Sequence, residues 1–485
     1  MKTSGAHHHL AGSALLVVVL LCGVLRVCTA APVTCVNAAD YASINAAVAA
    51  LPAGGGEVYL PAGEHRIERT ILLPDNVTLR GAGESTVLMA GPELDAFFAA
   101  EGCFGAEGDV PILFAPRHRH GAVIKNADPS GNRGIQVRDL RLATDRERVR
   151  LATGILLANV QDATIANVTI EDCGASAITM LDCRNCRVAS STIRRNHNGV
   201  FIMGGGDRAH DLWVTDSTLD SNRWSGIYLS SDGAGADRLR GGPENVTVSG
   251  NHIYNHMCDT AIKLHGPRYV FITGNRIDRA LEAGVENNGG VDVICMGNIV
   301  TRVDDGMDLK GNGVGLSFGR QPQRADLVVN GNITAECGVG VWSETILTTE
   351  AGARQGQVGG VAVVGNVARA NIAYGMGGCG VTDSAWVGNV NIDNGRHDAP
   401  PGQDTAGMLF TAGCRHGVIA GNVVADEAPE GEGLMQSGVL IRSSSEMINA
   451  LNAIEGATRA NLNLYGNQGV QTFDNLVEEE GAPVQ

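Results

Sequence analysis

Carboxylates and lysines gather in the middle of this 485-residue chain. The acidic residues concerned are Asp259, Glu282, Glu286, Asp304, Asp305, Asp308 and Glu336. Two of only four lysines, Lys263 and Lys310, stand among them, whereas arginine supplies the other 32 of the 36 basic residues. Like charges at close range need a cation, a shared proton or an ammonium group beside them. Because lysine gives up its proton far more readily than arginine, these positions predict proton transfer or metal binding.

A short repeat predicts how these residues are positioned. The unit Gly-Asn, followed within two residues by Val or Ile, begins at Gly250, Gly274, Gly297, Gly331, Gly365, Gly388 and Gly421. Copies without an insertion lie 23 or 24 residues apart, which is too short for a helix-turn-helix repeat and suits one coil of short strands. The asparagines should stack from coil to coil, where their side chains can satisfy polar groups that the turn buries.

A second pattern, Gly/Ala-Ile/Val-x-Leu/Ile, occurs once in every coil, for example at 177–180, 226–229 and 261–264. Alternation with a period of two is typical of a β-strand. The two patterns together predict two strands in each coil of an all-β solenoid, a parallel β-helix. Sixty-five glycines and an aromatic content of only 4% agree with many bends around a narrow aliphatic core.

Aligning the alternating runs places their outward residues in two columns, in which neighbours lie about 5 Å apart. The first column contains Tyr228, Lys263, Glu286, Asp308 and Gly340, and the second contains Ser230, His265, Asn288, Lys310 and Trp342. This arrangement predicts a groove with a charged centre and aromatic flanks. The predicted substrate-binding residues are Tyr228, His265, Glu286, Asn288, Trp342 and, on an adjoining insertion, Arg320.

The start of the chain after its first thirty residues resembles the opening of the pectate-lyase-like superfamily of right-handed β-helices. The resemblance rests on segments 40–48, 54–63 and 76–83, which read DYASINAAV, GGGEVYLPAG and NVTLRGAG. It implies a single-stranded right-handed parallel β-helix with an N-terminal capping helix, which the alanine-rich stretch 43–51 would form. This superfamily contains lyases, hydrolases, epimerases and binding proteins, so the site must decide the function.

The predicted organisation is one continuous domain, because each coil of a solenoid contacts only its neighbours. Residues 1–30 read as a signal peptide, with an apolar stretch at 15–25 and small residues at 29–31, and this predicts a secreted or periplasmic protein. Residues 31–57 are assigned to the cap, 58–476 to the β-helix and 477–485 to a tail. No other segment is expected to span a membrane. The remaining cysteines indicate either disulfides or core packing.

The string Asp304-Asp305-Gly306-Met307-Asp308 resembles the Asp-Asp-Gly-x-Asp element of family 9 pectate lyases. The resemblance implies calcium ligands at Asp304, Asp305 and Asp308, with Glu282 as a further ligand from the preceding coil. The family's base is a lysine that follows the motif, where this chain has no lysine, so Lys263 or Lys310 would have to serve. Lys310 is the predicted base, because it lies two residues after Asp308 on the same face.

The combined prediction is an enzyme that cleaves an acidic, uronate-containing polysaccharide by calcium-assisted β-elimination. The first alternative is a glycoside hydrolase that uses paired carboxylates such as Glu282 and Asp304. A non-catalytic carbohydrate-binding surface protein is the second alternative. The formal net charge of −16 argues against nucleic acid as a partner, since phosphate contacts need a basic surface. The sequence leaves the oligomeric state open.

Overall fold

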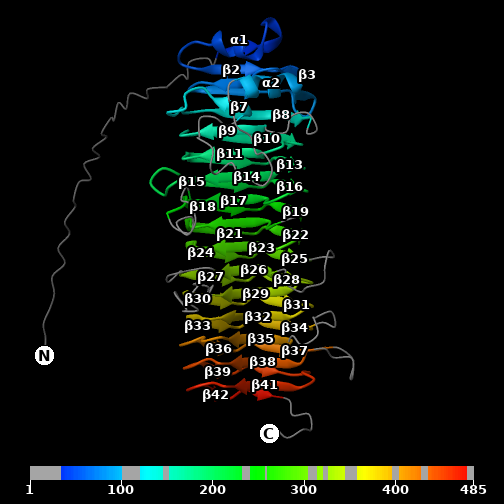
Figure 1. Ribbon diagram of the computed structural model, residues 1–485, viewed down its shortest axis with the longest axis vertical. Helices are drawn as coiled ribbons and strands as arrows, with labels where there is room; N and C mark the ends of the chain where they lie inside the picture. Colours follow the sequence, from blue (N-terminus) through cyan, green and yellow to red (C-terminus); the bar gives the residue numbers. More distant parts are fainter. Residues whose placement is uncertain are drawn as a thin grey trace, which may run out of the picture. The chain divides into compact units, whose positions relative to one another are not determined.

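The computed structural model describes residues 34–100, 121–145, 152–231, 241–256, 259–303, 314–319, 326–344, 358–395, 404–427 and 435–477. From Thr34 onward the chain forms one compact unit. Its strands stack in coils, with the N-terminal coils at one end and β41–β43 at the other (Figure 1). Among the described residues, no helix combines the length and the apolar character that crossing a membrane requires.

One strand of each coil enters a 14-stranded parallel sheet. Its members are β4 Ile71–Leu73, β7 Ala122–Asn126, β9 Thr153–Ala158, β11 Ser176–Leu181, β14 Asn198–Met203, β17 Ile227–Ser230, β20 Ile262–His265, β23 Ala283–Asn288, β26 Val314–Gly319, β29 Val339–Glu344, β32 Tyr374–Cys379, β35 Ala406–Thr411, β38 Ser437–Arg442 and β41 Ala460–Tyr465. This sheet carries the two outward columns that the sequence singles out.

A 29-stranded sheet holds the rest of each coil in two parallel ladders. The first ladder contains β1 Cys35–Asn37, β2 Gly56–Tyr59, β5 Val77–Arg80, β12 Arg184–Ala189, β15 His210–Thr215, β18 Glu244–Ser249, β21 Arg268–Thr273, β24 Val291–Met296, β27 Leu327–Asn330, β30 Val358–Val364, β33 Val381–Val387, β36 Val418–Ala420, β39 Ile448–Ala450 and β42 Gln471–Phe473.

The second ladder follows the turn at the end of the first. It contains β3 Gly63–Ile67, β6 Thr86–Ala90, β13 Thr192–Arg194, β16 Thr218–Asp220, β19 His252–His256, β22 Arg276–Ala280, β25 Ile299–Thr301, β28 Ile333–Ala335, β31 Val367–Arg369, β34 Val390–Ile392, β37 Val423–Ala425, β40 Ala453–Ile454 and β43 Leu476–Val477. The long strands β8 Gln136–Thr144 and β10 Thr164–Glu171 belong to both ladders. A coil therefore has three strands rather than the predicted two, because most second-ladder strands are too short to show alternation.

The N-terminal end carries the predicted helix as α1, Ile44–Ala49. Ser43 caps it, since its hydroxyl accepts a hydrogen bond from the Ala46 amide at 3.1 Å. The other helices are the 3-10 turn η1, Ala38–Asp40, and α2, Pro92–Ala100. Strand β1 pairs in parallel with β2, so regular pairing is already present within the segment that the sequence assigns to the cap.

A buried asparagine ladder joins the coils at the turn between the two ladders of strands. Asn298 donates to the Asn332 side-chain oxygen at 2.9 Å, and Asn332 donates to Asn366 at the same distance. The series continues through Asn251, Asn275, Asn298, Asn332, Asn366, Asn389, Asn422, Asn452 and Asn475. The glycine before each repeat asparagine has a positive φ, for example 62° at Gly331, which other residues rarely adopt. The predicted stacking of asparagines is confirmed.

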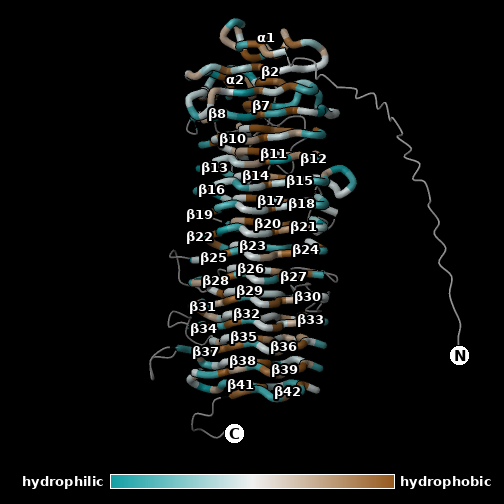
Figure 2. The backbone as a smooth tube through the Cα atoms, turned by 180° about the vertical axis from the view of Figure 1, so that it is seen from behind, coloured by the Kyte–Doolittle hydropathy of each residue, from teal (hydrophilic) through white to brown (hydrophobic). Residues whose placement is uncertain are grey.

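Hydrophobic and hydrophilic residues alternate along the coils (Figure 2), and the aliphatic side chains of the core are buried inside them. The predicted register of the 14-stranded sheet is confirmed from Phe201 through Tyr228 and Lys263 to Glu286. It is wrong one coil later. Ser317 on β26, and not Asp308, lies beside Glu286, and Trp342 follows Ser317 in the first column rather than the second. Residues 306–309 and 315–318 both fit the strand pattern, so periodicity alone could not choose between them.

Six of the cysteines that the structure describes are fully buried free thiols. Core packing therefore accounts for these six, including Cys183 and Cys186. The predicted signal peptide lies outside the described residues.

Candidate functional site

The site lies on the outward face of β17, β20 and β23 and on the turns before these strands. Lys263, on β20, is its centre. The Lys263 ammonium nitrogen lies 2.8 Å from an oxygen of Asp259, 3.2 Å from Glu286 and 3.9 Å from Glu282. The side chains of Asp259, Lys263 and Glu286 are only 8%, 16% and 14% exposed, whereas that of Glu282 is 59% exposed. One ammonium group therefore faces three carboxyl groups.

This imbalance separates the protonation states of the carboxyl groups. Burial and the hydrogen bond with Asp259 together raise the pKa of Glu282 to about 7. Asp259 behaves in the opposite way: burial would raise its pKa, but the charge of Lys263 and its hydrogen bond lower it overall. The two carboxyl groups thus share a proton that resides on Glu282 near neutral pH. Such a pair combines a potential general acid with an ionised neighbour.

Lys263 itself is held in its charged form. Burial alone would lower its pKa, but the carboxylates of Glu286 and Asp259 outweigh burial and raise the pKa above its usual value. A lysine in this state does not offer the neutral amine that abstraction of a proton requires. Its position suits electrostatic orientation of the carboxylates.

A chain of hydrogen bonds runs from the cluster to an aromatic residue. The Tyr228 hydroxyl lies 2.7 Å from Nδ1 of His265, and the Asn288 amide nitrogen lies 3.3 Å from Nε2 of the same ring. Asn288 also donates to Glu286 at 2.5 Å. Thr260 donates to the other oxygen of Glu286 at 3.2 Å, so both oxygens of this carboxylate are oriented.

Access to the outward face is limited to a few coils. On the N-terminal side the first-column residues Leu156, Thr179, Phe201 and Tyr228 are 0%, 0%, 3% and 8% exposed. On the C-terminal side Leu409 and Leu440 are 2% and 4% exposed. Between these limits Lys263, Glu286, Ser317 and Trp342 are partly exposed, and the Trp342 ring stacks on Tyr374 with centroids 5.8 Å apart. Because Phe201 and Tyr228 are buried, their ring faces are not free to stack on a sugar.

Asp259, Glu282 and Glu286 each place an oxygen within 4.8 Å of the others, which is a geometry that could hold a metal ion. The ammonium group of Lys263 already lies among these oxygens, so a divalent cation would have to displace it. These three residues therefore do not fit a resident calcium site. Asp304, Asp305, Asp308, Lys310 and Arg320 lie outside the described residues, and their predicted roles stay predictions.

Asp259 is the member of the cluster that the predicted set of site residues lacks. Asp259 belongs to neither outward column, because it lies in the turn four residues before Lys263. Ser225, one coil earlier, donates to Asp259 at 3.0 Å and fixes its orientation. The sequence places Asp259 in the acidic centre, and its i to i+4 spacing from Lys263 is the signal that could have added it to the predicted site residues.

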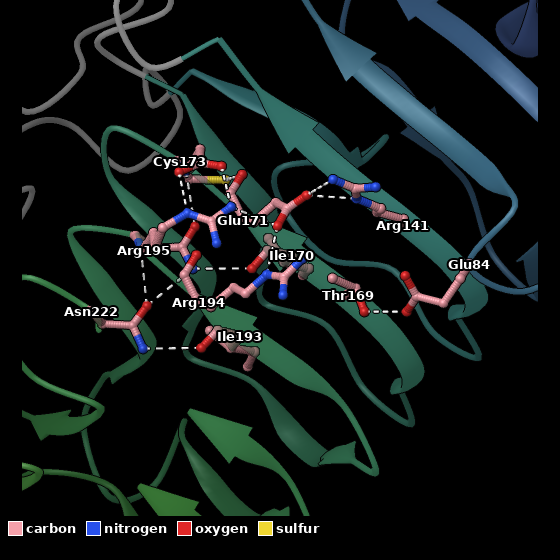
Figure 3. Close-up of polar contacts among 12 residues, drawn as sticks. Glu84, Arg141, Thr169, Ile170, Glu171, Cys173, Ile193, Arg194, Arg195 and Asn222 are labelled. Atoms are coloured by element: carbon pink, nitrogen blue, oxygen red, sulfur yellow. Dashed lines mark hydrogen bonds and ion pairs between the residues drawn. The ribbon is translucent and has the colours of Figure 1, made fainter. Parts of the chain in front are cut away.

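A second carboxylate cluster lies several coils away, at the junction of the second ladder with the 14-stranded sheet (Figure 3). The Glu171 side chain is 1% exposed and contacts Arg141, Arg194 and Arg195. Arg194 and Arg195 approach it at 2.6 and 2.8 Å, and Arg195 also pairs with Asp172 at 2.7 Å. Burial would raise the pKa of Glu171, but the hydrogen bonds from Arg194 and Arg141 lower it overall.

Comparison with known proteins agrees with the architecture. The family model of the right-handed β-helix region matches residues 153–236, which confirms the predicted fold for those coils. No curated protein sequence matches the chain.

Three similar solved structures have different roles. They are the AlgE6 A-module of a mannuronan C-5 epimerase from Azotobacter vinelandii (18% identity, 93% of this chain and 100% of that chain, TM-score 0.39), the surface adhesin PfbA of Streptococcus pneumoniae (13%, 92% and 91%, 0.47) and the catalytic unit of a GH87 α-1,3-glucanase from Streptomyces thermodiastaticus (14%, 89% and 70%, 0.46). Identities below 20% with TM-scores below 0.5 do not identify an activity that the chain shares with any of them.

Proposed function

We propose that the chain is a carbohydrate-active enzyme that hydrolyses a glycosidic bond with the carboxyl groups of Glu282 and Glu286. The observation that carries this proposal is the position of Glu282, whose pKa is raised to about 7, beside two carboxyl groups that Lys263 contacts at 2.8 and 3.2 Å. Glycoside hydrolysis needs one protonated and one ionised carboxyl group at the same bond. The predicted base Lys310 lies outside the described residues, and Lys263 is held in its charged form, so the carboxyl groups that the structure describes favour the hydrolase over the lyase as the first candidate.

Each residue of the cluster has a distinct role in this proposal. Glu282 is the most exposed of the three acids and would donate its proton to the departing sugar oxygen. Glu286, with both oxygens oriented, would attack or stabilise the sugar ring as the ionised carboxylate. Asp259 and Lys263 are positioning residues: Asp259 raises the pKa of Glu282, and Lys263 holds Glu286 in place through a 3.2 Å ion pair.

The distance between the carboxyl groups favours a retaining reaction. Their nearest oxygens lie within 4.8 Å. Retaining enzymes have carboxyl groups about 5–5.5 Å apart, whereas inverting enzymes need about 6.5–9.5 Å to admit a water molecule. We therefore expect a covalent glycosyl intermediate on Glu286.

Charge and access restrict the substrate. Three carboxyl groups and one lysine disfavour a strongly anionic sugar at the centre of the site, so a neutral or weakly charged polysaccharide fits better. Lys263 and Trp342 mark the two ends of the partly exposed column and lie three strand spacings apart, which corresponds to roughly 14 Å. This length admits a few sugar rings, with the exposed face of Trp342 as a stacking surface at one end.

A β-elimination is the second candidate, because Tyr228 and His265 form a pair of groups that can exchange a proton. In that reaction His265 would take the proton next to the uronate carboxylate, and Lys263 with the protonated Glu282 would reduce the repulsion of that carboxylate. This candidate requires an acidic sugar and yields an unsaturated product.

A polysaccharide panel tests the proposal. The wild-type protein is incubated with neutral and uronate-containing polysaccharides while reducing ends and ultraviolet absorbance are followed. New reducing ends without absorbance support hydrolysis, and absorbance supports elimination. Glu282→Gln should lower turnover about 10²–10⁴-fold, whereas the control Glu64→Gln, an exposed carboxylate on β3, should leave it unchanged. Turnover that survives in Glu282→Gln, or no activity on any substrate, overturns the proposed function.

A further inference from the structure

The outward faces of the two ladders in the 29-stranded sheet change character along the molecule. Three of the outward columns on these faces, two on the first ladder and one on the second, show this change. In six N-terminal coils the columns read Gln136, Thr164, Arg187, Trp213, Thr247, Phe271; Arg138, Ala166, Ala189, Thr215, Ser249, Thr273; and Arg141, Thr169, Thr192, Thr218, His252, Arg276. These positions are mostly polar, and four of them are arginines.

The next six coils carry an almost entirely apolar surface in the same columns. We call it the apolar strip. It consists of Ile294, Val328, Ala362, Ala385, Val418, Ile448; Met296, Asn330, Val364, Val387, Ala420, Ala450; and Ile299, Ile333, Val367, Val390, Val423, Ala453. Asn330 is the one polar residue among these eighteen, and none is charged.

The side chains of the strip face solvent. Met296, Ile299, Val423 and Ile448 are 44%, 43%, 41% and 41% exposed. Val328 is 38% exposed. The coils themselves do not require apolar residues here, because the N-terminal coils fold in the same way with threonine, serine and arginine at the equivalent positions. An exposed apolar patch larger than a few hundred square ångströms marks an interaction surface.

The strip has the size of a protein interface. Six coils at about 4.8 Å and three columns about 7 Å apart give roughly 600 Å² before the relief of the side chains is counted. A standard interface buries about 600–1,000 Å² on each partner. The strip spans the turn at which the buried asparagine ladder lies. Hydrogen bonds between these asparagines join the coils beneath the strip and hold its surface in a fixed shape.

We propose that the apolar strip is the interface of a homodimer, occupied by the same strip of a second copy of this chain. A chain with a formal net charge of −16 repels its own copies over most of its surface. The strip itself carries no charge, and the nearby Asp326 and Asp383 lie at its edge beside Val328 and Ala362, so two copies that meet there bury apolar side chains and leave these carboxylates at the rim. A two-fold interface also requires a surface that is complementary to itself, and an uncharged apolar surface meets that requirement.

Sedimentation equilibrium of the full chain between about 0.5 and 50 μM tests this proposal. The expected mass is twice the chain mass of 50.5 kDa, with an association that strengthens as salt screens the negative charge of the two copies. The double variant Val328→Asp with Ile333→Asp should weaken association at least a hundredfold, because it would place like charges opposite each other in the interface. A milder pair, Val364→Ser with Val423→Ser, should weaken it about tenfold.

Leu72→Asp is the matched control, since Leu72 is 44% exposed on β4 and lies outside the strip. It should leave the dimer intact, and circular dichroism should show that every variant keeps the β-sheet content of the wild type. A wild-type protein that stays monomeric at 50 μM overturns the proposal, and so does a dimer that both strip variants leave unchanged. A monomer that binds lipid vesicles through the strip would also overturn it, because the occupant would then be a membrane surface.

Discussion

Two groups of buried carboxylates differ in how many cations accompany them. Glu171 and Asp172 have three arginines, Arg141, Arg194 and Arg195. Asp259, Glu282 and Glu286 have a single lysine. The first group, the Glu171 cluster, keeps the pKa of its buried acid below the ordinary value. The second, the Lys263 cluster, raises the pKa of one acid to about 7.

The difference shows how one fold supplies both rigid junctions and reactive groups. A carboxylate that is surrounded by guanidinium groups stays ionised and holds adjacent coils together, as Glu171 does between β10 and β13 (Figure 3). A carboxyl group that shares one ammonium with two others retains a proton near neutral pH and can donate it. The two clusters therefore differ in the ratio of cations to carboxylates and also in exposure, since the Glu282 side chain is 59% exposed and that of Glu171 is 1% exposed.

Removal of the single lysine should have the largest effect. Lys263→Gln removes the cation that lowers the pKa of Asp259, and it removes the ion pair that holds Glu286 in the catalytic pair. We expect turnover on the substrate found above to fall at least a hundredfold. The free energy of unfolding at pH 7 should fall by about 2 kcal/mol, since one partner of a mostly buried ion pair is lost. Urea denaturation and initial rates measure these effects.

A variant with normal turnover would contradict the role of Lys263. Ser225→Ala is a graded control, because it removes only the 3.0 Å hydrogen bond to Asp259 and should lower turnover less than Lys263→Gln.

Removal of the carboxylate, in place of the cation, tests the Glu171 cluster. Glu171→Gln leaves three guanidinium groups around a neutral amide, and these should repel one another. The arginine side chains are 37–45% exposed, so solvent reduces the penalty, and we expect a loss of about 2 kcal/mol of stability. Turnover per folded molecule should stay within about twofold of wild type. A large loss of turnover without a loss of stability would mean that the two clusters are not functionally distinct.

Much of this comparison could be predicted from the sequence, and part could not. The repeat placed the asparagine ladder and brought Lys263 next to Glu286, because strand pairing leaves little freedom once the coil length is known. The repeat gave the wrong register for Asp308 and Trp342. The insertion there contains two segments that both fit the strand pattern, and the one that forms β26 is Val314–Gly319. The protonation of Glu282 could not be predicted, because it depends on the Asp259 rotamer and on burial by the turn.

The smallest predicted effect is the pH dependence of stability, which should have opposite signs in the two clusters. The folded-state pKa of Glu282 is about 7 against an ordinary 4.5, so the folded state binds more protons in that interval and stability falls as pH rises from 4.5 to 7. Glu171 has a lowered pKa, so its contribution is complete above 4.5 and is lost as pH falls.

Thermal unfolding midpoints between pH 3 and 8 measure both slopes. Glu282→Gln should reduce only the decline toward pH 7. Glu171→Gln should reduce only the acid decline, to which Glu57 and Asp278 also contribute because their pKa values are lowered. If either variant changes both slopes, or neither, the assignment of the two titrations is wrong.

The most direct measurement is the titration of the Glu282 side chain itself. Carbon-13 NMR of the protein labelled at the glutamate carboxyl carbons, with Glu282→Gln to assign the resonance, follows this group without any knowledge of the substrate. The account predicts a midpoint near pH 7, together with a shift toward higher pH in Lys263→Gln. A midpoint near 4.5, the ordinary value for glutamate, would show that Glu282 is ionised at neutral pH and would contradict its role as the proton donor.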